Sequence, residues 1–305
     1  MAIDLTERVA LVTGSAHRVG KAIAVELARH GVNVMVHYNS ADDDTVRETL
    51  QEIRTHDVDA FARQADISTE AGVASLFDAL SQHFSRLDFL VNSASTFTGN
   101  RFMDVTLADW HKSMSVNVTA PLLCTQAAVR LMRENNPPGG AVINILDYGA
   151  ARPWVQRVDH GVSKAALAML TQVSALALGA ENIRVNGVLP GPVLKAPGMS
   201  DEDWARIGET TALGRTGSAE DVARAVVYLA REEFISGTVL HVNGDDPEAV
   251  VFCAELALRS PGSLSVSQTL PTLCASLRSE WLCRTTSGSA ARIFSSSSCL
   301  LTISS

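Results

Sequence analysis

Three side chains that can hold or move a proton stand close together in the second half of the chain. His160 and Lys164 lie four residues apart in the segment DHGVSK, and Asp147 follows the apolar run GAVINIL. If residues 160–178 form a helix, the imidazole and the ammonium lie one turn apart on one face and point into one cleft. An imidazole, an ammonium and a carboxylate so placed favour general acid–base chemistry.

The proton chemistry of this trio depends on which partner is nearer to the imidazole. A free imidazole has a pKa of about 6.5, so the neutral ring is a hydrogen-bond donor but a very poor acid, and only imidazolium can protonate a substrate. A neighbouring ammonium lowers the pKa of an imidazole, whereas an ionised carboxylate within about 4–6 Å raises it. The sequence leaves both outcomes open.

The pattern of apolar runs predicts the scaffold that must position these residues. Seven short runs, most of them continuous rather than alternating, recur between longer amphipathic stretches. Continuous runs are typical of strands buried on both faces of a parallel sheet. Residues 19–30 have the helical period and are followed by Gly31 as a stop signal. The alternation predicts an α/β fold, a three-layer doubly wound parallel sheet of the Rossmann type with about seven strands.

The rhythm of strands and helices ends near residue 246. We therefore expect a single domain over residues 1–246. Residues 247–305 are rich in serine and contain no lysine, and we treat them as an atypical C-terminal extension of unknown structure whose composition is compatible with disorder.

Composition excludes several classes of partner. The net charge of −8 and the pI near 5.5 argue against nucleic acid, because no basic stripe is available to neutralise phosphates. The first apolar run is too short for a signal or a membrane span, so we expect a soluble, cytoplasmic protein with no membrane partner. The five cysteines form no C-x-x-C pair, and we expect no metal site.

The segment VALVTGSAHRVGKAIA combines a buried strand, a polar loop and an apolar-periodic helix. That order places backbone N–H groups and a helix N-terminus against a pyrophosphate. Gly14 would allow the tight turn, and Gly20 would let the helix pack close to the strand. The candidate phosphate contacts are Gly14, Ser15, His17, Arg18, Val19 and Gly20.

The second strand ends in HYNS, where the ribose of a dinucleotide should lie. A carboxylate there would bind a free 2′-hydroxyl and repel a 2′-phosphate; none is present, and Arg18 stands in the loop, so NADP(H) is favoured over NAD. Arg18 as a solvated loop cation is the alternative. The candidate contacts here are His37, Tyr38, Asn39 and Ser40, with Asp66 and Ile67 after the third strand near the adenine, unless Asp66 only caps the next helix.

With its other motifs, the chain resembles the short-chain dehydrogenase/reductase family over roughly residues 5–245. The motifs are TGSAHRVG, NSAS at 92–95, Asn117 in MSVNVTAPLL, Asp147 in INILD, HGVSK at 160–164 and RVNGVLPG at 184–191. Arginine replaces the middle glycine of the loop, and aspartate replaces the usual catalytic serine. With HYNS, these departures look like the pteridine reductase branch, but His160 stands where the family has its catalytic tyrosine.

The resemblance implies roles for further residues. Lys164 would hold the nicotinamide ribose, and Asn117 would keep a water chain to that lysine. The other implied cofactor contacts are Asn92, Ser93, Ala94, Pro190, Gly191 and Val193, and the implied substrate contacts are Ser95, Phe97, Asp147, Trp154 and His160. Family members commonly pair the helices expected at 106–132 and 160–178, which implies a homo-oligomer, a dimer or tetramer.

Three interpretations of His160 follow. An Asp147–His160 pair serves as general acid; or Asp147 or a bound water delivers the proton while His160 orients the substrate; or the cleft binds NADP and transfers hydride poorly. Tyr148 is a further donor candidate that should point elsewhere. We expect an NADPH-dependent reductase of a pteridine-like C=N or a carbonyl in a small molecule. The alternatives are a 3-oxoacyl or general carbonyl reductase and an NADP-binding pseudoenzyme or scaffold.

Overall fold

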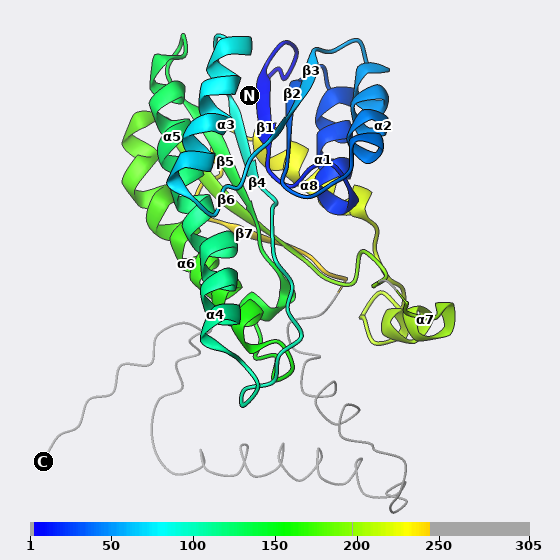
Figure 1. The fold of residues 1–305 in the computed structure, drawn as a ribbon. Helices are drawn as coiled ribbons and strands as arrows, with labels where there is room; N and C mark the ends of the chain where they lie inside the picture. The colour runs from blue at the N-terminus through cyan, green and yellow to red at the C-terminus, as the bar shows by residue number, and fades with distance from the viewer. Residues whose placement is uncertain (1–2, 197, 245–305) are drawn as a thin grey trace, which may run out of the picture. The chain divides into compact units, whose positions relative to one another are not determined.

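The computed structural model describes residues 3–196 and 198–244, which lie within one compact unit spanning Met1–Val251. The extension expected at 247–305 lies outside the described residues. Seven parallel strands form one sheet in the order β3-β2-β1-β4-β5-β6-β7, which confirms the predicted fold class (Figure 1). The strands are β1 (Val9–Val12), β2 (Asn33–Tyr38), β3 (Ala60–Gln64), β4 (Phe89–Asn92), β5 (Gly140–Ile145), β6 (Ile183–Pro190) and β7 (Val239–Val242).

The strands form because their side chains are apolar on both faces. All four residues of β1 and all eight of β6 are buried. Strand β1 pairs with β2 on one side and β4 on the other, so the strand order reverses beside β1. In doubly wound sheets the crevice at such a reversal, outside the carboxyl ends of the strands, is where ligands bind.

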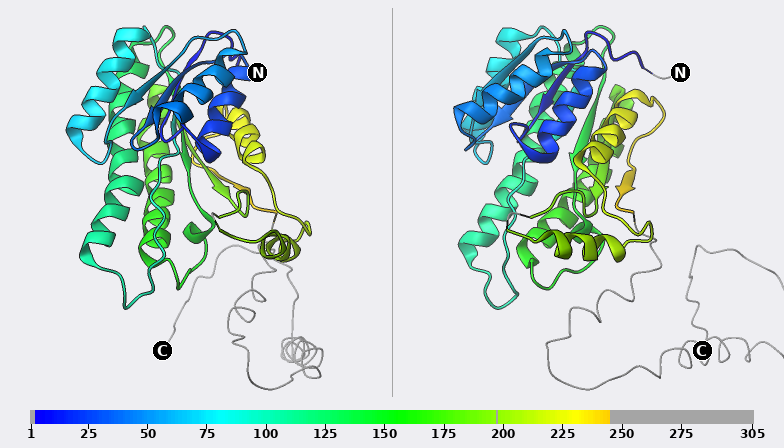
Figure 2. Two further views of the ribbon diagram at one scale, coloured as in Figure 1. Left: turned by 45° about the vertical axis from the view of Figure 1, so that its right-hand side comes forward. Right: turned by 90° about the vertical axis from the view of Figure 1, so that its right-hand side faces the viewer.

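Helices cover both faces of the sheet (Figures 1 and 2). Helices α1, α2 and α8 lie on one face, and α3, α5 and α6 lie on the other. The α-helices are α1 (Arg18–Arg29), α2 (Asp43–Arg54), α3 (Glu70–His83), α4 (Leu107–Met114), α5 (Ala120–Glu134), α6 (Val158–Leu178), α7 (Asp201–Glu209) and α8 (Ala219–Arg231). Two clusters of buried side chains, one on each face, form the core.

The helix expected at 106–132 is not continuous. A π-helical turn, η1 (Ser115–Thr119), separates α4 from α5, and Asn117 lies in this turn with its side chain fully buried. A π turn adds a residue to the helical repeat and rotates the side chains around it, and such turns are frequent at functional sites. Two short 3₁₀ turns, η2 (Tyr148–Ala150) and η3 (Gly179–Glu181), flank α6.

Candidate active site

The phosphate loop joins β1 to α1 and depends on two glycines. Gly14 has φ 64°, and a Cβ there would lie 2.8 Å from the Cα of Ala94. A Cβ on Gly20 would lie 2.3 Å from the carbonyl oxygen of Gly14. The loop and the first turn of α1 therefore approach each other more closely than any other residue type allows, which leaves backbone N–H groups facing the crevice.

Arg18 has a backbone conformation that is more typical of glycine. Its φ is 57°, in the left-handed region that L-residues adopt at a cost of roughly 1–2 kcal/mol. His17 precedes it as the N-cap of α1 in an extended conformation. Both residues are exposed, so the guanidinium at the N-terminus of α1 is accessible to a phosphate.

Thr13 fastens the phosphate loop to the turn that follows β4. Its hydroxyl accepts hydrogen bonds from the backbone N–H groups of Ser93 at 3.0 Å and Ala94 at 3.1 Å. The candidate contacts Ser93 and Ala94 are thus held beside Gly14. The sequence pattern did not predict this role of Thr13, because a threonine at a strand end has no periodic signal.

His37 lies beneath the loop instead of at its surface. Its Nδ1 accepts a hydrogen bond from the N–H of Gly14 at 3.0 Å, and its Nε2 donates to the carbonyl of Ala65 at 3.0 Å. The side chain is 1% exposed, and burial lowers its pKa despite the opposing hydrogen bond to Ala65. A neutral His37 therefore shapes the loop from below, and both of its ring nitrogens are already bonded.

The remaining candidates at the ribose and adenine end lie at the surface. Asn39, Ser40 and Asp66 are exposed, and Tyr38 is half-buried. Asp66 accepts hydrogen bonds from the N–H and the hydroxyl of Ser68, which lower the pKa of its carboxyl group. It does not cap α3, whose N-cap is Thr69. Ile67 is buried beneath this turn.

Lys164 lies on the first part of α6 with its ammonium below the carboxyl end of β5. The Nζ atom donates to the carbonyl of Ile145 at 2.8 Å, and the residue is 3% exposed. Burial lowers the pKa of Lys164 to about 8, although the charge of Asp147 opposes this effect. The ammonium is therefore still mainly protonated at neutral pH.

Asp147 and His160 face each other across the same end of the sheet. His160 Nε2 lies 3.6 Å from Asp147 Oδ1, and the N–H of Gly149 donates to that same oxygen at 2.8 Å. Burial acts to raise the pKa of Asp147, but the interactions with His160, the Gly149 N–H and the charge of Lys164 outweigh it and lower the pKa. The trio predicted from the sequence thus meets in one place, with an anionic carboxylate beside the ring.

The other nitrogen of His160 is already bonded. Nδ1 donates to the backbone carbonyl of Thr96 at 3.0 Å, whereas the buried Nε2 has no hydrogen-bond partner within the described part of the chain. The Thr96 contact requires a proton on Nδ1, so Nε2 is the nitrogen that can accept or release a proton toward a bound molecule. A side chain that is 2% exposed with one unbonded nitrogen is poised for a ligand.

Asn117 connects the segment after β4 that contains Ser95 and Thr96 to α6. Its Oδ1 accepts from the Thr96 N–H at 2.9 Å and from the Ser95 hydroxyl at 3.1 Å. Its Nδ2 donates to the Ser163 hydroxyl at 2.9 Å and to the Thr96 carbonyl at 3.2 Å. The Thr96 carbonyl therefore receives donors from both Asn117 and His160, and the π turn brings the amide to this position.

Aromatic side chains line the substrate side of the trio. The rings of Phe97 and His160 are 4.6 Å apart edge to face, and those of Phe97 and Trp154 are 5.9 Å apart. Phe97 is 53% and Trp154 37% exposed, so both leave apolar surface accessible beside the trio. Tyr148 points elsewhere, as expected: its hydroxyl is bonded to Arg152, whose guanidinium lies over the tyrosine ring.

The remaining candidates line the neighbouring strand ends. Asn92 is 3% exposed, and its Nδ2 donates to Asn144 at 2.8 Å, so its side chain holds β4 against β5. Gly191 follows β6, and a Cβ there would lie 2.6 Å from the Cα of Asn243. Pro190 and Val193 are buried on either side of it.

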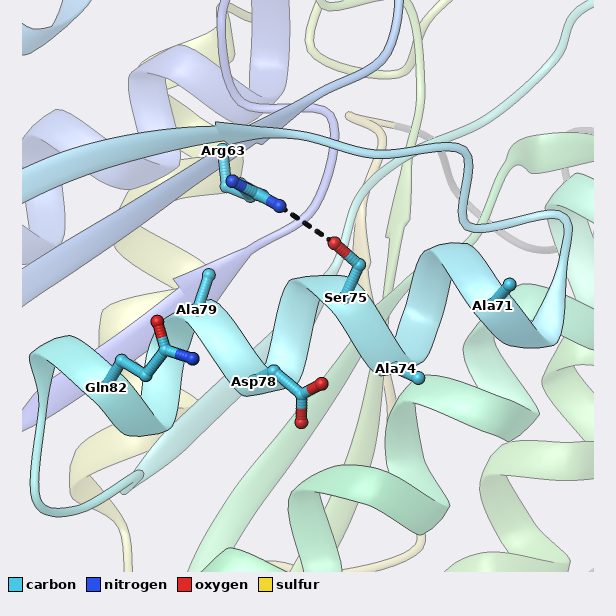
Figure 3. Close-up of a pocket in the computed structure, with 7 residues that line it drawn as sticks. All are labelled: Arg63, Ala71, Ala74, Ser75, Asp78, Ala79 and Gln82. Carbon is cyan, nitrogen blue, oxygen red and sulfur yellow. Dashed lines mark hydrogen bonds between the residues drawn. The ribbon is translucent and has the colours of Figure 1, made fainter.

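Figure 3 shows a separate hollow at the edge of the sheet. Arg63 from β3 reaches the Ser75 hydroxyl of α3 at 2.9 Å. The hollow is shallow and open, and it contains none of the trio or phosphate-loop residues. Its lining residues are Arg63, Ala71, Ala74, Ser75, Asp78, Ala79 and Gln82.

Known proteins are similar in sequence to this chain over most of the described residues. A family model described as enoyl-(acyl carrier protein) reductase matches residues 14–244. Glucose 1-dehydrogenase 2 of Bacillus subtilis (strain 168) is 34% identical over 248 residues, which are 79% of this chain and 95% of that protein. The 3-oxoacyl-(acyl-carrier-protein) reductase of Aquifex aeolicus (strain VF5) is 32% identical over 249 residues, 80% of this chain and 99% of that protein.

Solved structures show the same likeness. A blue fluorescent protein from a metagenomic library, in complex with NADPH, superposes with a TM-score of 0.73 at 31% identity and covers 79% of this chain and 98% of its own. A mutant short-chain dehydrogenase/reductase of Serratia marcescens gives a TM-score of 0.73 at 31% identity, with the same coverage.

Proposed function

Because the chain belongs to the short-chain dehydrogenase/reductase family, whose members are oxidoreductases, we propose that it reduces a small carbonyl compound with NADP(H) and uses His160 as the proton donor. The observation that carries this proposal is the position of the His160 ring. Its Nδ1 is bonded to the Thr96 carbonyl, and its buried Nε2, which has no hydrogen-bond partner in the described part of the chain, lies 3.6 Å from Asp147 Oδ1.

The residues of the crevice fit a phosphorylated nicotinamide dinucleotide. Gly14 and Gly20 leave room for a pyrophosphate at the N-terminus of α1. Arg18 and the exposed Asn39 and Ser40, with no carboxylate at positions 37–40, suit a 2′-phosphate better than a free 2′-hydroxyl. Lys164 lies where its ammonium can hold a ribose hydroxyl. The glycines and Lys164 suit either nicotinamide dinucleotide, whereas Arg18 and the lack of a carboxylate at positions 37–40 support NADP(H) over NAD.

When bound, NADPH would supply the hydride to the carbonyl carbon. His160 imidazolium donates its Nε2 proton to the carbonyl oxygen as negative charge develops there, while Nδ1–H stays on the Thr96 carbonyl. Asp147 attracts the positive charge on the ring before transfer, and its 26% exposed side chain gives a path for a new proton from solvent. Lys164 adds a second positive charge beneath the reacting oxygen.

The direct test follows NADPH oxidation with a panel of aldehydes and ketones in the wild type, His160→Ala and His160→Tyr. Alanine should lower kcat by about 10²–10⁴, because general acid catalysis is lost. Tyrosine should keep or raise the activity, since a phenol hydroxyl restores a proton donor above Lys164. If the wild type binds NADPH in calorimetry but turns over no probe, and tyrosine restores nothing, the protein is a cofactor-binding pseudoenzyme instead.

A pteridine ring is a second candidate substrate. The combination of Arg18 in the phosphate loop, Asp147 after β5 and the exposed rings of Phe97 and Trp154 supports it, because a flat heterocycle would stack on the rings and donate N–H hydrogen bonds to the Asp147 carboxylate. NADPH oxidation assays with dihydrobiopterin and folate, run beside the carbonyl panel, distinguish the two substrate classes. Turnover of the carbonyl compounds alone would exclude the pteridine reductase proposal.

We further propose that the protein acts as a homo-oligomer. Residues 158–181 form the one stretch within the described ranges that is long and apolar enough to cross a membrane by composition, yet its first turns carry the buried His160 and Lys164. Its outer face exposes Met169 at 59%, Val173 at 53% and Leu176 at 88%. A second copy covering this face explains its apolarity, and Leu176→Lys should shift the protein toward the monomer in light scattering.

A further inference from the structure

Arg157 stands at the entrance to the active site. It is the residue before α6 and lies three positions before His160. Its guanidinium carbon is 3.8 Å from the centroid of the Phe97 ring and 5.1 Å from that of Trp154. Both rings are exposed in part, so the cation and the two aromatic faces form one continuous surface on the substrate side of the trio.

The guanidinium is held in place but has donors to spare. One nitrogen, Nη1, donates to the backbone carbonyl of Thr98 at 3.0 Å. Within residues 3–196 and 198–244, no carboxylate lies at ion-pair distance from Arg157. A guanidinium has five N–H donors in a rigid fork that matches a carboxylate, and only one of them is bonded here. Burial lowers the pKa of Arg157 against the attraction of Asp147, so this cation is partly desolvated.

Phe97 sets the separation between this cation and the proton donor. The edge-to-face contact of its ring with His160 has a centroid distance of 4.6 Å, and Arg157 lies over the ring face. The guanidinium and the imidazole therefore both contact the same ring. A ring-shaped substrate whose carbonyl oxygen lies at His160 would place a group on the opposite side of its own ring close to Arg157.

We propose that Arg157 binds a carboxylate of the substrate, so that the enzyme prefers carbonyl compounds with an apolar or aromatic body and a terminal carboxylate. This inference rests on the proposed function, because it takes the trio as the reacting end. Phe97 and Trp154 hold the body, and the guanidinium fork pairs with the carboxylate. Arg157 is then a specificity-determining residue that sets KM and leaves the chemical step unchanged.

The test compares para-formylbenzoate with its methyl ester, two aldehydes that differ in the charge at the far end of one ring. Steady-state kinetics with NADPH are measured for the wild type, Arg157→Gln and Arg157→Lys. Arg101→Gln is the matched control. Arg101 is an exposed arginine in the loop that carries Phe97, and its substitution by glutamine removes the same charge.

We expect Arg157→Gln to raise the KM for para-formylbenzoate by about 10- to 100-fold with kcat nearly unchanged, because a charge-assisted interaction is lost. The ester should change less than about threefold. Arg157→Lys should recover part of the loss, since the charge remains but the fork does not. Arg101→Gln should leave the ratio between the two substrates unchanged.

Calorimetry with enzyme loaded with NADP⁺ separates this inference from the proposed function. If no aldehyde is reduced but the carboxylate binds more tightly than the ester, and Arg157→Gln removes the difference, then the proposed reductase activity fails and the role of Arg157 stands. Equal affinity of the wild type for the two compounds, lack of binding of both, or an equal loss for both in Arg157→Gln overturns the inference.

Discussion

The Nε2 atom of His160 lies 3.6 Å from Oδ1 of Asp147, whereas Nδ1 of the same ring is 3.0 Å from the carbonyl oxygen of Thr96. The second contact is a hydrogen bond, and the first is too long to be a good one. The ring therefore takes its orientation from Thr96 and its charge environment from Asp147. A substrate oxygen that approaches Nε2 does not have to break a tight ion pair.

Lys164 should make stability depend on pH in an unusual direction. Its pKa falls from 10.5 to about 8 on folding because burial disfavours the charged form. Between these values the unfolded state binds the proton and the folded state does not, so this group makes the free energy of unfolding rise with pH across that window. Below pH about 8 Lys164 lowers the free energy of unfolding by its full amount, which is on the order of 3 kcal/mol.

Urea unfolding of the wild type and Lys164→Met across this pH range measures the effect. The wild type should gain stability relative to the methionine variant as pH rises, because methionine has nothing to titrate. A difference between the two proteins that stays constant with pH would contradict the assignment. In the same range the reductase activity of the wild type should decline through pH about 8, as the ammonium loses its proton.

Gly20→Ala should damage the cofactor site. Its new Cβ would lie 2.3 Å from the Gly14 carbonyl oxygen, so the phosphate loop must move. We expect a loss of about 1–3 kcal/mol in stability and at least about tenfold weaker NADPH binding in calorimetry. Gly179→Ala is the control, because a Cβ there meets nothing within 4 Å. Unchanged NADPH affinity in Gly20→Ala would mean that the cofactor does not use this loop.

Arg18→Gly separates backbone strain from cofactor charge. Relief of the left-handed conformation at φ 57° gains roughly 1–2 kcal/mol, and the added freedom of glycine in the unfolded chain offsets about 0.5–1 kcal/mol. The variant should be equally stable or up to about 1.5 kcal/mol more stable, but should lose its preference for NADPH over NADH.

Glu7→Gly is the matched control for this substitution. Glu7 lies in a turn before β1 and also has a left-handed φ, 62°. Its N–H donates to the carbonyl of Gly31. It should show the same change in urea midpoint with no change in cofactor preference. An Arg18→Gly enzyme that still prefers NADPH would move the 2′-phosphate contact to another residue.

Asp159→Asn should loosen the loop that holds His160. The carboxylate is 1% exposed, and its Oδ2 accepts from Ser113 at 2.6 Å and from the hydroxyl of Thr98. An amide is a weaker acceptor and leaves its own N–H groups without a partner, so we expect a loss of about 1–3 kcal/mol in stability. Since Thr98 lies two residues after Thr96, kcat should fall as well. Ser113→Ala, which removes one of the two donors to Asp159, should show a smaller loss of stability and of kcat.

The sheet and the phosphate loop were predictable because they follow local rules. Continuous apolar runs such as the one containing Leu11 are buried on both faces, and the spacing of Gly14 and Gly20 is read directly from the sequence. The meeting of Asp147, His160 and Lys164 followed from the helical spacing of the last two and from the position of Asp147 after an apolar run.

The remaining details depend on tertiary contacts that have no local signature. The apolar pattern around Asn117 continues through 106–132, so it gave no warning of the π turn that buries this amide. The sequence does not show whether a histidine at a strand end faces solvent or, as His37 does, bonds to the backbone beneath a loop. The distance between His160 and Asp147 depends on how α6 packs against the end of β5 and on the Thr96 contact, and no spacing in the sequence predicts it.

The shared carbonyl of Thr96 has a consequence for how this active site can change. It receives the Nδ1 proton of His160 and the Nδ2 proton of Asn117. A tyrosine at position 160 has no counterpart to Nδ1, so it would leave this acceptor with a single donor and lose about 1 kcal/mol of folding stability. A histidine at this position therefore also stabilises the segment that contains Thr96, a contribution that a phenol donor at the same position would not make.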